Sequence, residues 1–155
     1  MPRKINSNIN STAFPSIHST TIESMNRKIP FLSLFPHSNL YKVYLNDEQL
    51  SIPYRIYHDE PHHTIIQQLE PQQKAIFACF YTRHCDGFVR EQMLRYIIKL
   101  DDAYVVPYVI QLTGEYVYEI LEVIYDHLED LNIDSYLNFI FENPVYFAKT
   151  KARMI

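Results

Sequence analysis

Glycine is nearly absent from this chain: only Gly87 and Gly114 occur among its 155 residues. Loops that cradle the phosphates of a nucleotide need several closely spaced glycines, because only a backbone without side chains can approach the phosphates so closely. Two glycines placed far apart cannot form such a loop. The sequence therefore excludes nucleotide-binding enzymes that depend on a glycine-rich loop.

Cysteine, tryptophan and long apolar runs are also scarce. Tryptophan is absent, and the two cysteines, Cys79 and Cys85, are too few for a disulfide scaffold and are expected to be buried thiols. No apolar run approaches the roughly 18 residues that cross a bilayer. Polar residues follow Arg3 and Lys4, where a signal peptide would be apolar. These absences predict a cytoplasmic protein that does not act on membranes.

Basic residues are missing between Leu100 and Ala148, and the acidic residues are concentrated there. The ten acidic residues of this stretch are Asp101, Asp102, Glu115, Glu119, Glu122, Asp126, Glu129, Asp130, Asp134 and Glu142. Such a surface repels a phosphate backbone, so nucleic acid is not an expected partner. The stretch indicates either docking of a protein with a basic surface or a solvated face that keeps the chain soluble.

The chain divides into three parts by composition. Residues 1–30 are polar and aperiodic, which predicts a flexible, disordered tail. Residues 31–63 are expected to hold a β-hairpin and a loop, with strands at 41–45 and 52–57 around a turn at 46–49. Residues 64–155 show helical periodicity and should form one globular domain together with 31–63.

The helical part contains six expected helices, whose ends are marked by proline and aspartate. The expected ranges are 71–83, 87–100, 103–113, 115–129, 134–142 and 144 to the chain end. Pro71 and Pro144 suit first helical positions, Asp86 suits an N-cap, and Pro107 must lie in the first turn of its helix or kink it. The fold class is therefore mainly α, with about three stacked antiparallel helix pairs.

Two segments 28 residues apart share a pattern: Asp86-Gly87-Phe88-Val89-Arg90-Glu91 and the segment from Gly114 to Leu128. In this register Val89 matches Val117, so both are expected to be buried alike. The first segment resembles the second helix of a HEAT repeat, the second resembles another copy, and Asn143-Pro144-Val145 resembles the start of a third. The resemblance covers about 71–155 and implies a scaffold that binds through its helical surface, without catalytic residues. Arg90 would then be able to bridge to a neighbouring repeat.

The candidate site is the acidic side of the predicted helix 115–129. Its acidic residues are spaced by four, three, four and three positions, which places them on one face opposite the apolar stripe. The predicted partner-binding residues are Glu115, Glu119, Glu122, Asp126 and Tyr118. Tyr104 and Tyr108 are further surface aromatic residues in this interpretation. We expect a non-enzymatic protein-binding module without a cofactor or a bound metal.

Three alternatives remain open at this point. His58, His62 and His63 carry metal-ligand side chains in one loop, so a metal-dependent enzyme is the second hypothesis. Arg83-His84-Cys85-Asp86 brings nucleophile and base types together, although neighbouring residues in a chain point apart. The third hypothesis is an immunity or inhibitor protein that blocks a basic partner. The sequence does not indicate an oligomeric state.

Overall fold

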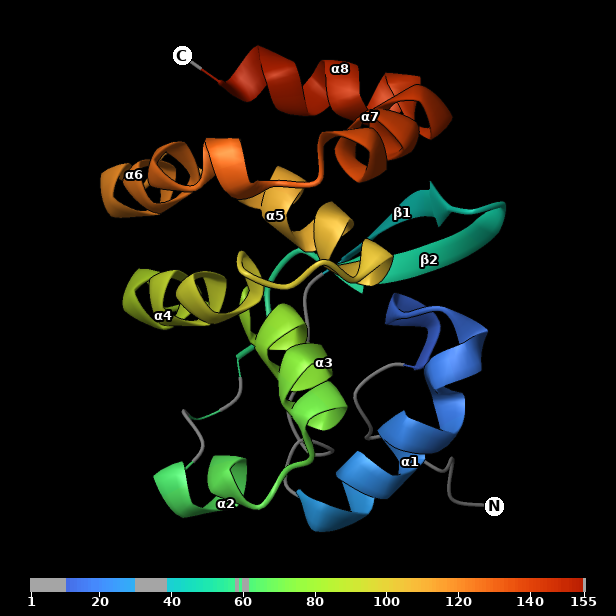
Figure 1. Ribbon diagram of the computed structural model, residues 1–155, viewed down its shortest axis with the longest axis vertical. Helices are drawn as coiled ribbons and strands as arrows, with labels where there is room; N and C mark the ends of the chain where they lie inside the picture. Colours follow the sequence, from blue (N-terminus) through green and yellow to red (C-terminus); the bar gives the residue numbers. More distant parts are fainter. Residues whose placement is uncertain (1–10, 30–38, 58, 60–61, 155) are drawn as a thin grey trace.

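The computed structural model describes residues 11–29, 39–57, 59 and 62–154 (Figure 1). It confirms a mainly α-helical chain with one antiparallel β-hairpin. The helices are α1 Ser19–Lys28, α2 His63–Gln67, α3 Pro71–Tyr81, α4 Gly87–Ile97, α5 Val106–Leu112, α6 Tyr118–Asp126, α7 Ile133–Glu142 and α8 Pro144–Arg153. The strands are β1 Leu40–Leu45 and β2 Glu48–Pro53, and short 3-10 turns lie at Ser11–Ala13, Ser16–His18, Ala103–Val105 and Leu128–Asp130. Among the described residues no helix is both long and apolar enough to span a bilayer.

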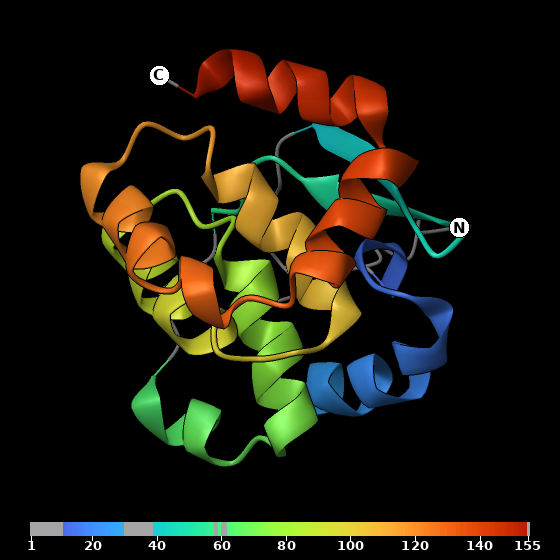
Figure 2. The same ribbon diagram turned by 45° about the horizontal axis from the view of Figure 1, so that its top comes forward.

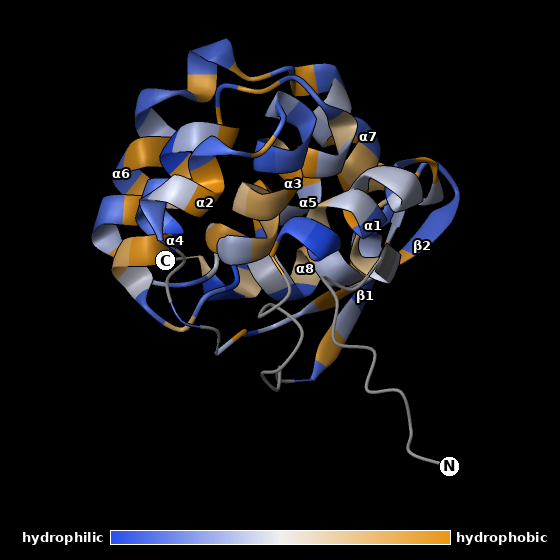
Figure 3. Ribbon diagram, turned by 90° about the horizontal axis from the view of Figure 1, so that it is seen from below, coloured by the Kyte–Doolittle hydropathy of each residue, from blue (hydrophilic) through white to orange (hydrophobic). Residues whose placement is uncertain are grey.

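Successive helices from α3 onward pack in pairs. Helix α3 contacts α4, α5 contacts α6, and α7 contacts α8, while α4 also contacts α6 and α5 contacts α7 (Figure 1). The centre of the molecule is apolar: every residue of α5 is buried, and so are most residues of α3 (Figure 3). The pairing agrees with the expected stacking, and the resemblance to HEAT repeats itself stays a prediction.

Proline residues and an aspartate cap mark the helix starts, as the sequence indicated. Pro71 and Pro144 each occupy the first position of their helix, and Pro107 lies in the first turn of α5. Proline is tolerated there because the first N–H groups of a helix have no partner inside the helix. The Asp86 side chain accepts a hydrogen bond from the Phe88 N–H at 2.9 Å and so caps α4.

The hairpin is tighter than expected. Asn46 and Asp47 alone connect the strands, with φ of 50° and 66°, and Leu45 pairs with Glu48. Two left-handed residues form a turn whose twist matches that of the flanking strands, and Asn and Asp tolerate this conformation. The predicted turn at 46–49 and the second strand at 52–57 are therefore wrong, because Glu48 and Gln49 already belong to β2.

The junction of α7 and α8 holds the hairpin. The Glu142 carboxylate accepts hydrogen bonds from the N–H groups of Asn46 and Asp47 at 2.9 and 2.7 Å. The Asn143 side chain accepts from the Tyr44 N–H and donates to the Tyr44 carbonyl, both at 2.7 Å. These contacts satisfy the backbone groups of Tyr44 on the outer edge of β1 and two N–H groups of the turn, and α8 continues from them beside the hairpin (Figure 2). Glu142 is thus a half-buried residue that binds the hairpin turn, so its carboxylate is already engaged within the chain.

The predicted flexible tail is wrong for residues 11–29, and residues 1–10 lie outside the described part. Helix α1 packs on α3, and the turn at Ser11–Ala13 packs on β2 (Figure 1). Phe14, Ile22, Met25 and Ile29 are all buried in the core. The last three are spaced by three and four residues, as on one helix face. The apolar residues of this segment are separated by many Ser, Thr and Asn residues, so the average composition is polar although the apolar spacing is helical.

The predicted match between residues 28 positions apart is wrong, because the two helices do not begin 28 residues apart. Val89 is buried and lies inside α4, whereas Val117 is only partly buried and is the N-cap of α6. The three buried residues of α6 instead match, at a shift of 26, buried residues in the last turn of α4 and directly after it: the pairs are Leu94 and Ile120, Ile97 and Val123, and Ile98 and Ile124. Gly87 and Gly114 are 27 residues apart, close to the predicted shift, but α4 begins at its glycine whereas α6 begins only at Tyr118.

Candidate functional site

Helix α6 exposes a mixed aromatic and acidic side. It buries Ile120, Val123 and Ile124, and at 100° per residue the opposite side points to solvent. Tyr118 and Tyr125 are 73% and 75% exposed on that side. We call the α6 face the set of exposed residues on this helix: Tyr118, Glu119, Leu121, Glu122, Tyr125 and Asp126.

Four of the predicted partner-binding residues lie together on the α6 face. Tyr118, Glu119, Glu122 and Asp126 are all exposed, and in the described part of the chain none of the three carboxylates forms an ion pair. Tyr125 was missed by sequence reasoning, although it is seven residues from Tyr118 and so shares its side of the helix. Tyr104 and Tyr108, in contrast, are buried at 4% and 0% exposure, so their prediction as surface residues is wrong.

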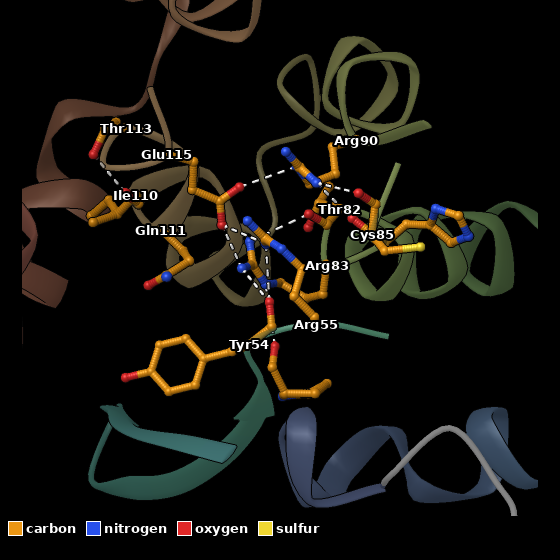
Figure 4. Close-up of polar contacts among 12 residues, drawn as sticks. Tyr54, Arg55, Thr82, Arg83, Cys85, Arg90, Ile110, Gln111, Thr113 and Glu115 are labelled. Atoms are coloured by element: carbon orange, nitrogen blue, oxygen red, sulfur yellow. Dashed lines mark hydrogen bonds and ion pairs between the residues drawn. The ribbon is translucent and has the colours of Figure 1, made fainter. Parts of the chain in front are cut away.

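Glu115 does not belong to the α6 face. It lies in the turn between α5 and α6, and its side chain is only 6% exposed. Its carboxylate contacts Arg55 at 2.9 Å, Arg83 at 2.5 Å and Arg90 at 3.2 Å (Figure 4). The prediction that Glu115 forms part of an exposed stripe without cationic neighbours is therefore wrong. The sequence misled because the spacing of four to Glu119 holds only if the helix extends to residue 115.

The three arginines come from different elements, and Glu115 joins them. Arg55 follows β2, Arg83 follows α3, and Arg90 lies in α4. Arg90 contacts the turn of the neighbouring α5–α6 pair, although its Nε and the Glu115 Oε2 are not aligned as a hydrogen bond, and that this pair is a repeat stays a prediction. We call these four residues the Arg–Glu115 cluster. It ties the hairpin, the α3–α4 junction and the α5–α6 turn into one unit.

Backbone carbonyl groups accept hydrogen bonds from the buried guanidinium groups of Arg83 and Arg90. Arg83, whose side chain is fully buried, donates to the carbonyls of Pro53 at 3.2 Å and Tyr54 at 2.7 Å. Arg90 donates to the carbonyls of His84 at 2.8 Å and Cys85 at 3.1 Å. Carbonyl oxygens satisfy donors but carry no full charge. The charge balance of the cluster therefore depends on its carboxylate.

Burial and the neighbouring charges shift the pKa of Arg90 in the cluster. Burial lowers the pKa of Arg90, the guanidinium groups of Arg55 and Arg83 lower it further, and Glu115 acts in the opposite direction. Tyr41, which packs under the Arg83 guanidinium, adds no charge at neutral pH because burial raises its pKa. Among the described residues, Glu115 is the carboxylate that contacts all three guanidinium groups, and the charge of Asp86 also acts on Arg90.

Tyr116 is held in an unusual backbone conformation next to the cluster. Turn hydrogen bonds continue α5 as far as the one from the Glu115 N–H to the Leu112 carbonyl at 3.2 Å. Tyr116 then adopts φ of 56°, the left-handed conformation that ends many helices and that glycine usually supplies. Its ring is nevertheless 59% exposed. A strained, exposed aromatic residue at this place marks the turn as a region of functional interest.

Replacing Tyr116 by glycine is expected to stabilise the fold by up to about 1 kcal/mol. Glycine removes the strain of the left-handed backbone, but it also makes the unfolded chain more flexible, which offsets part of this gain. Alanine keeps the Cβ atom and so keeps the strain. Tyr116→Ala is therefore the control, expected to be no more stable than the original chain. Urea unfolding of the three proteins measures the difference, and equal stability of the glycine and alanine variants would contradict the assignment.

The other candidate residues do not converge. His62 and His63 are exposed, and the His62 ring lies 3.0 Å from the Thr64 hydroxyl at the start of α2, while His58 lies outside the described residues. Within the described chain, no three His, Cys, Asp or Glu side chains gather as a metal site would require. Cys79 is buried as expected, but Cys85 is exposed, so that prediction is wrong for the second thiol.

Comparison with protein-family models, with curated proteins and with solved structures finds no match for this chain. Function is therefore inferred from the geometry of these residues alone.

Proposed function

We propose that the protein is a non-enzymatic, cytoplasmic interaction module that docks a protein with a basic surface through the α6 face. The observation that supports this best is on α6: Tyr118 and Tyr125, both about three-quarters exposed, lie beside three exposed carboxylates that form no ion pair with any other described residue. Tyrosine rings are enriched where proteins bind each other, because they combine apolar area with a hydroxyl group. Solvation alone accounts for the carboxylates but not for the rings.

The charges of the α6 face define the partner. Glu119, Glu122 and Asp126 are close enough on the helix to repel one another, which costs a few tenths of a kcal/mol per pair. Lysine or arginine residues on a partner relieve this repulsion and speed the encounter. The neighbouring turn at Leu128–Asp130 adds the exposed acidic residues Glu129 and Asp130. The face therefore favours a basic protein surface with an apolar patch that receives the two rings.

The aromatic part of the proposal is tested by removing the two rings. The double variant Tyr118→Ser and Tyr125→Ser should keep the fold, since both side chains lie outside the core. The matched control is Tyr44→Ser with Tyr57→Ser, which removes two rings that are 46% and 50% exposed and lie outside α6. The three proteins are immobilised in equal amounts and exposed to extract from the source cells, and the captured proteins are quantified by mass spectrometry.

The expected result is a set of basic proteins that the original chain and the control capture equally and the α6-face variant loses by about tenfold or more. Tyrosine is enriched among the interface residues whose truncation weakens binding most, and a combined loss of about 1.4 kcal/mol already corresponds to tenfold. Equal capture by all three proteins would place the interface elsewhere. Capture of acidic proteins alone would contradict the charge argument.

A further inference from the structure

Helix α7 carries a row of large apolar side chains on its outer side. Ile133, Leu137 and Phe141 follow one another at intervals of four residues and are 55%, 43% and 78% exposed. This spacing places them on one side of the helix, opposite Phe139, which is buried in the core. Val145, in the first turn of α8, continues the interval and is 69% exposed. We call Ile133, Leu137, Phe141 and Val145 the α7–α8 patch.

The α7–α8 patch is larger than the scattered apolar residues of an ordinary protein surface. Helix α7 contacts α5 and β1, and these contacts leave the patch exposed. Single exposed apolar side chains are common, whereas a row of them on successive turns of one helix marks a site of interaction. The apolar area that four such side chains leave in water is on the order of several hundred Å². A standard protein interface buries roughly 800 Å² per partner, so the patch suits the centre of a weak, reversible one.

Charges of opposite sign lie at the two ends of the patch. Glu129 precedes Ile133 by four residues and belongs to the short turn at Leu128–Asp130. Lys149 follows Val145 by four residues and lies in α8. Both residues are exposed, and in the described part of the chain neither takes part in an ion pair. The patch therefore has an acidic end and a basic end, with apolar residues between them.

We infer that the α7–α8 patch binds the same patch of a second copy of this chain, with the two α7 helices antiparallel about a two-fold axis. A two-fold interface uses one surface twice, so that surface must be complementary to itself. The antiparallel arrangement meets this condition, because the acidic end of each copy faces the basic end of the other. With the axis midway between Leu137 and Phe141, Leu137 packs on the partner's Phe141, and Glu129 faces the partner's Lys149.

The apolar residues and the charges have different roles in this dimer. Burial of the apolar row supplies the affinity, since the driving force follows the apolar area that is removed from water. The pairs of Glu129 with Lys149 lie at the exposed ends, where an ion pair adds little to affinity. They do distinguish the orientations, because a parallel dimer would place like charges together at both ends.

Sedimentation velocity over a range of protein concentrations tests the apolar part of this inference. The original chain is compared with Phe141→Ser, which removes a ring that lies outside the core. Phe88→Ser is the matched control, since Phe88 is 63% exposed and lies on α4. Circular dichroism should be the same for all three proteins, because neither ring is buried.

We expect a dimer with a dissociation constant on the order of micromolar, as its modest apolar area suggests. Phe141→Ser should weaken it by about tenfold or more, because each dimer loses two rings from its centre. Phe88→Ser should change the dissociation constant less than about twofold. The inference is overturned if the original chain stays monomeric, if it assembles beyond the dimer, or if the two variants associate equally well.

The orientation is tested by reversing the charges at the two ends. Lys149→Glu should weaken the dimer about three- to tenfold, because it sets like charges against each other twice in each dimer. Adding Glu129→Lys to this variant should restore the original dissociation constant. A double variant that associates no better than Lys149→Glu would overturn the antiparallel arrangement. Phe141 and Lys149 are not part of the α6 face, so failure here leaves the capture experiment unaffected.

Discussion

Glu115→Gln is expected to lower the free energy of unfolding by about 3–5 kcal/mol, the usual cost of removing one partner from a buried ion pair. The reason is the arrangement of the cluster. Glutamine keeps the size of the side chain but removes the only carboxylate that contacts Arg55, Arg83 and Arg90 among the described residues. Arg83 is fully buried and cannot turn to water, so its charge would remain without a partner of opposite sign.

Glu119→Gln is the matched control for this prediction. It makes the same chemical change four residues later, at an exposed position, and should shift stability by no more than about 0.5 kcal/mol. Thermal and urea unfolding of both variants give the comparison. A loss below about 1 kcal/mol for Glu115→Gln would mean that the arginines reach solvent or other anions without it, and the cluster would then not join the three elements.

Phe14→Ala is expected to cost about 3–5 kcal/mol, the typical loss when a buried phenylalanine is truncated. The Phe14 side chain is 1% exposed, stacks on Tyr108 with ring centroids 5.3 Å apart, and meets Tyr104 edge-on at 6.1 Å. The Tyr108 hydroxyl also donates to the Ala13 carbonyl at 2.7 Å. Because these contacts join the first described residues to α5, the N-terminal segment contributes directly to the stability of the helical core.

Ile17→Ala serves as the control for Phe14→Ala, since Ile17 is 84% exposed only three residues away. This change should leave the melting temperature within about a degree or two of the original, as surface substitutions usually do. Near-UV circular dichroism of the tyrosines should change for Phe14→Ala and not for Ile17→Ala. If both variants melt like the original chain, residues 11–29 do not pack on the core in solution.

The helical part of the fold was predictable because its signals are local. Pro71, Pro107, Pro144 and Asp86 act within one turn of their own position, and the apolar periods between them are regular. The N-terminal segment was not predictable, because its few apolar residues are buried by contacts with distant elements. Average polarity over 1–30 describes the segment as a whole and overlooks the spacing of Ile22, Met25 and Ile29.

The candidate site was predictable only where exposure follows from helix geometry. Glu119, Glu122 and Asp126 share the side of α6 that the apolar residues leave free, so their period places them correctly. Glu115 has the same spacing but lies before the helix, and its environment depends on Arg55 and Arg83, which are 60 and 32 residues away. The spacing of residues within one segment cannot predict contacts with residues so far away in the sequence. That three arginines contact one carboxylate becomes visible only in three dimensions.

The most direct test of the proposed function measures the association rate of the basic partner captured in the experiment above, over a range of salt concentrations. Three proteins are compared: the original chain, Glu119→Gln with Glu122→Gln and Asp126→Asn, and a control with the same net charge. The control carries Glu23→Gln in α1, Glu91→Gln in α4 and Asp59→Asn outside the helices and strands, so all three changes lie away from α6.

The account predicts that the α6-face variant associates about tenfold more slowly at low salt, that the control associates nearly as fast as the original chain, and that high salt removes the difference. If the α6-face variant and the control associate equally fast at low salt, the carboxylates of α6 do not steer a partner, and the central claim is contradicted.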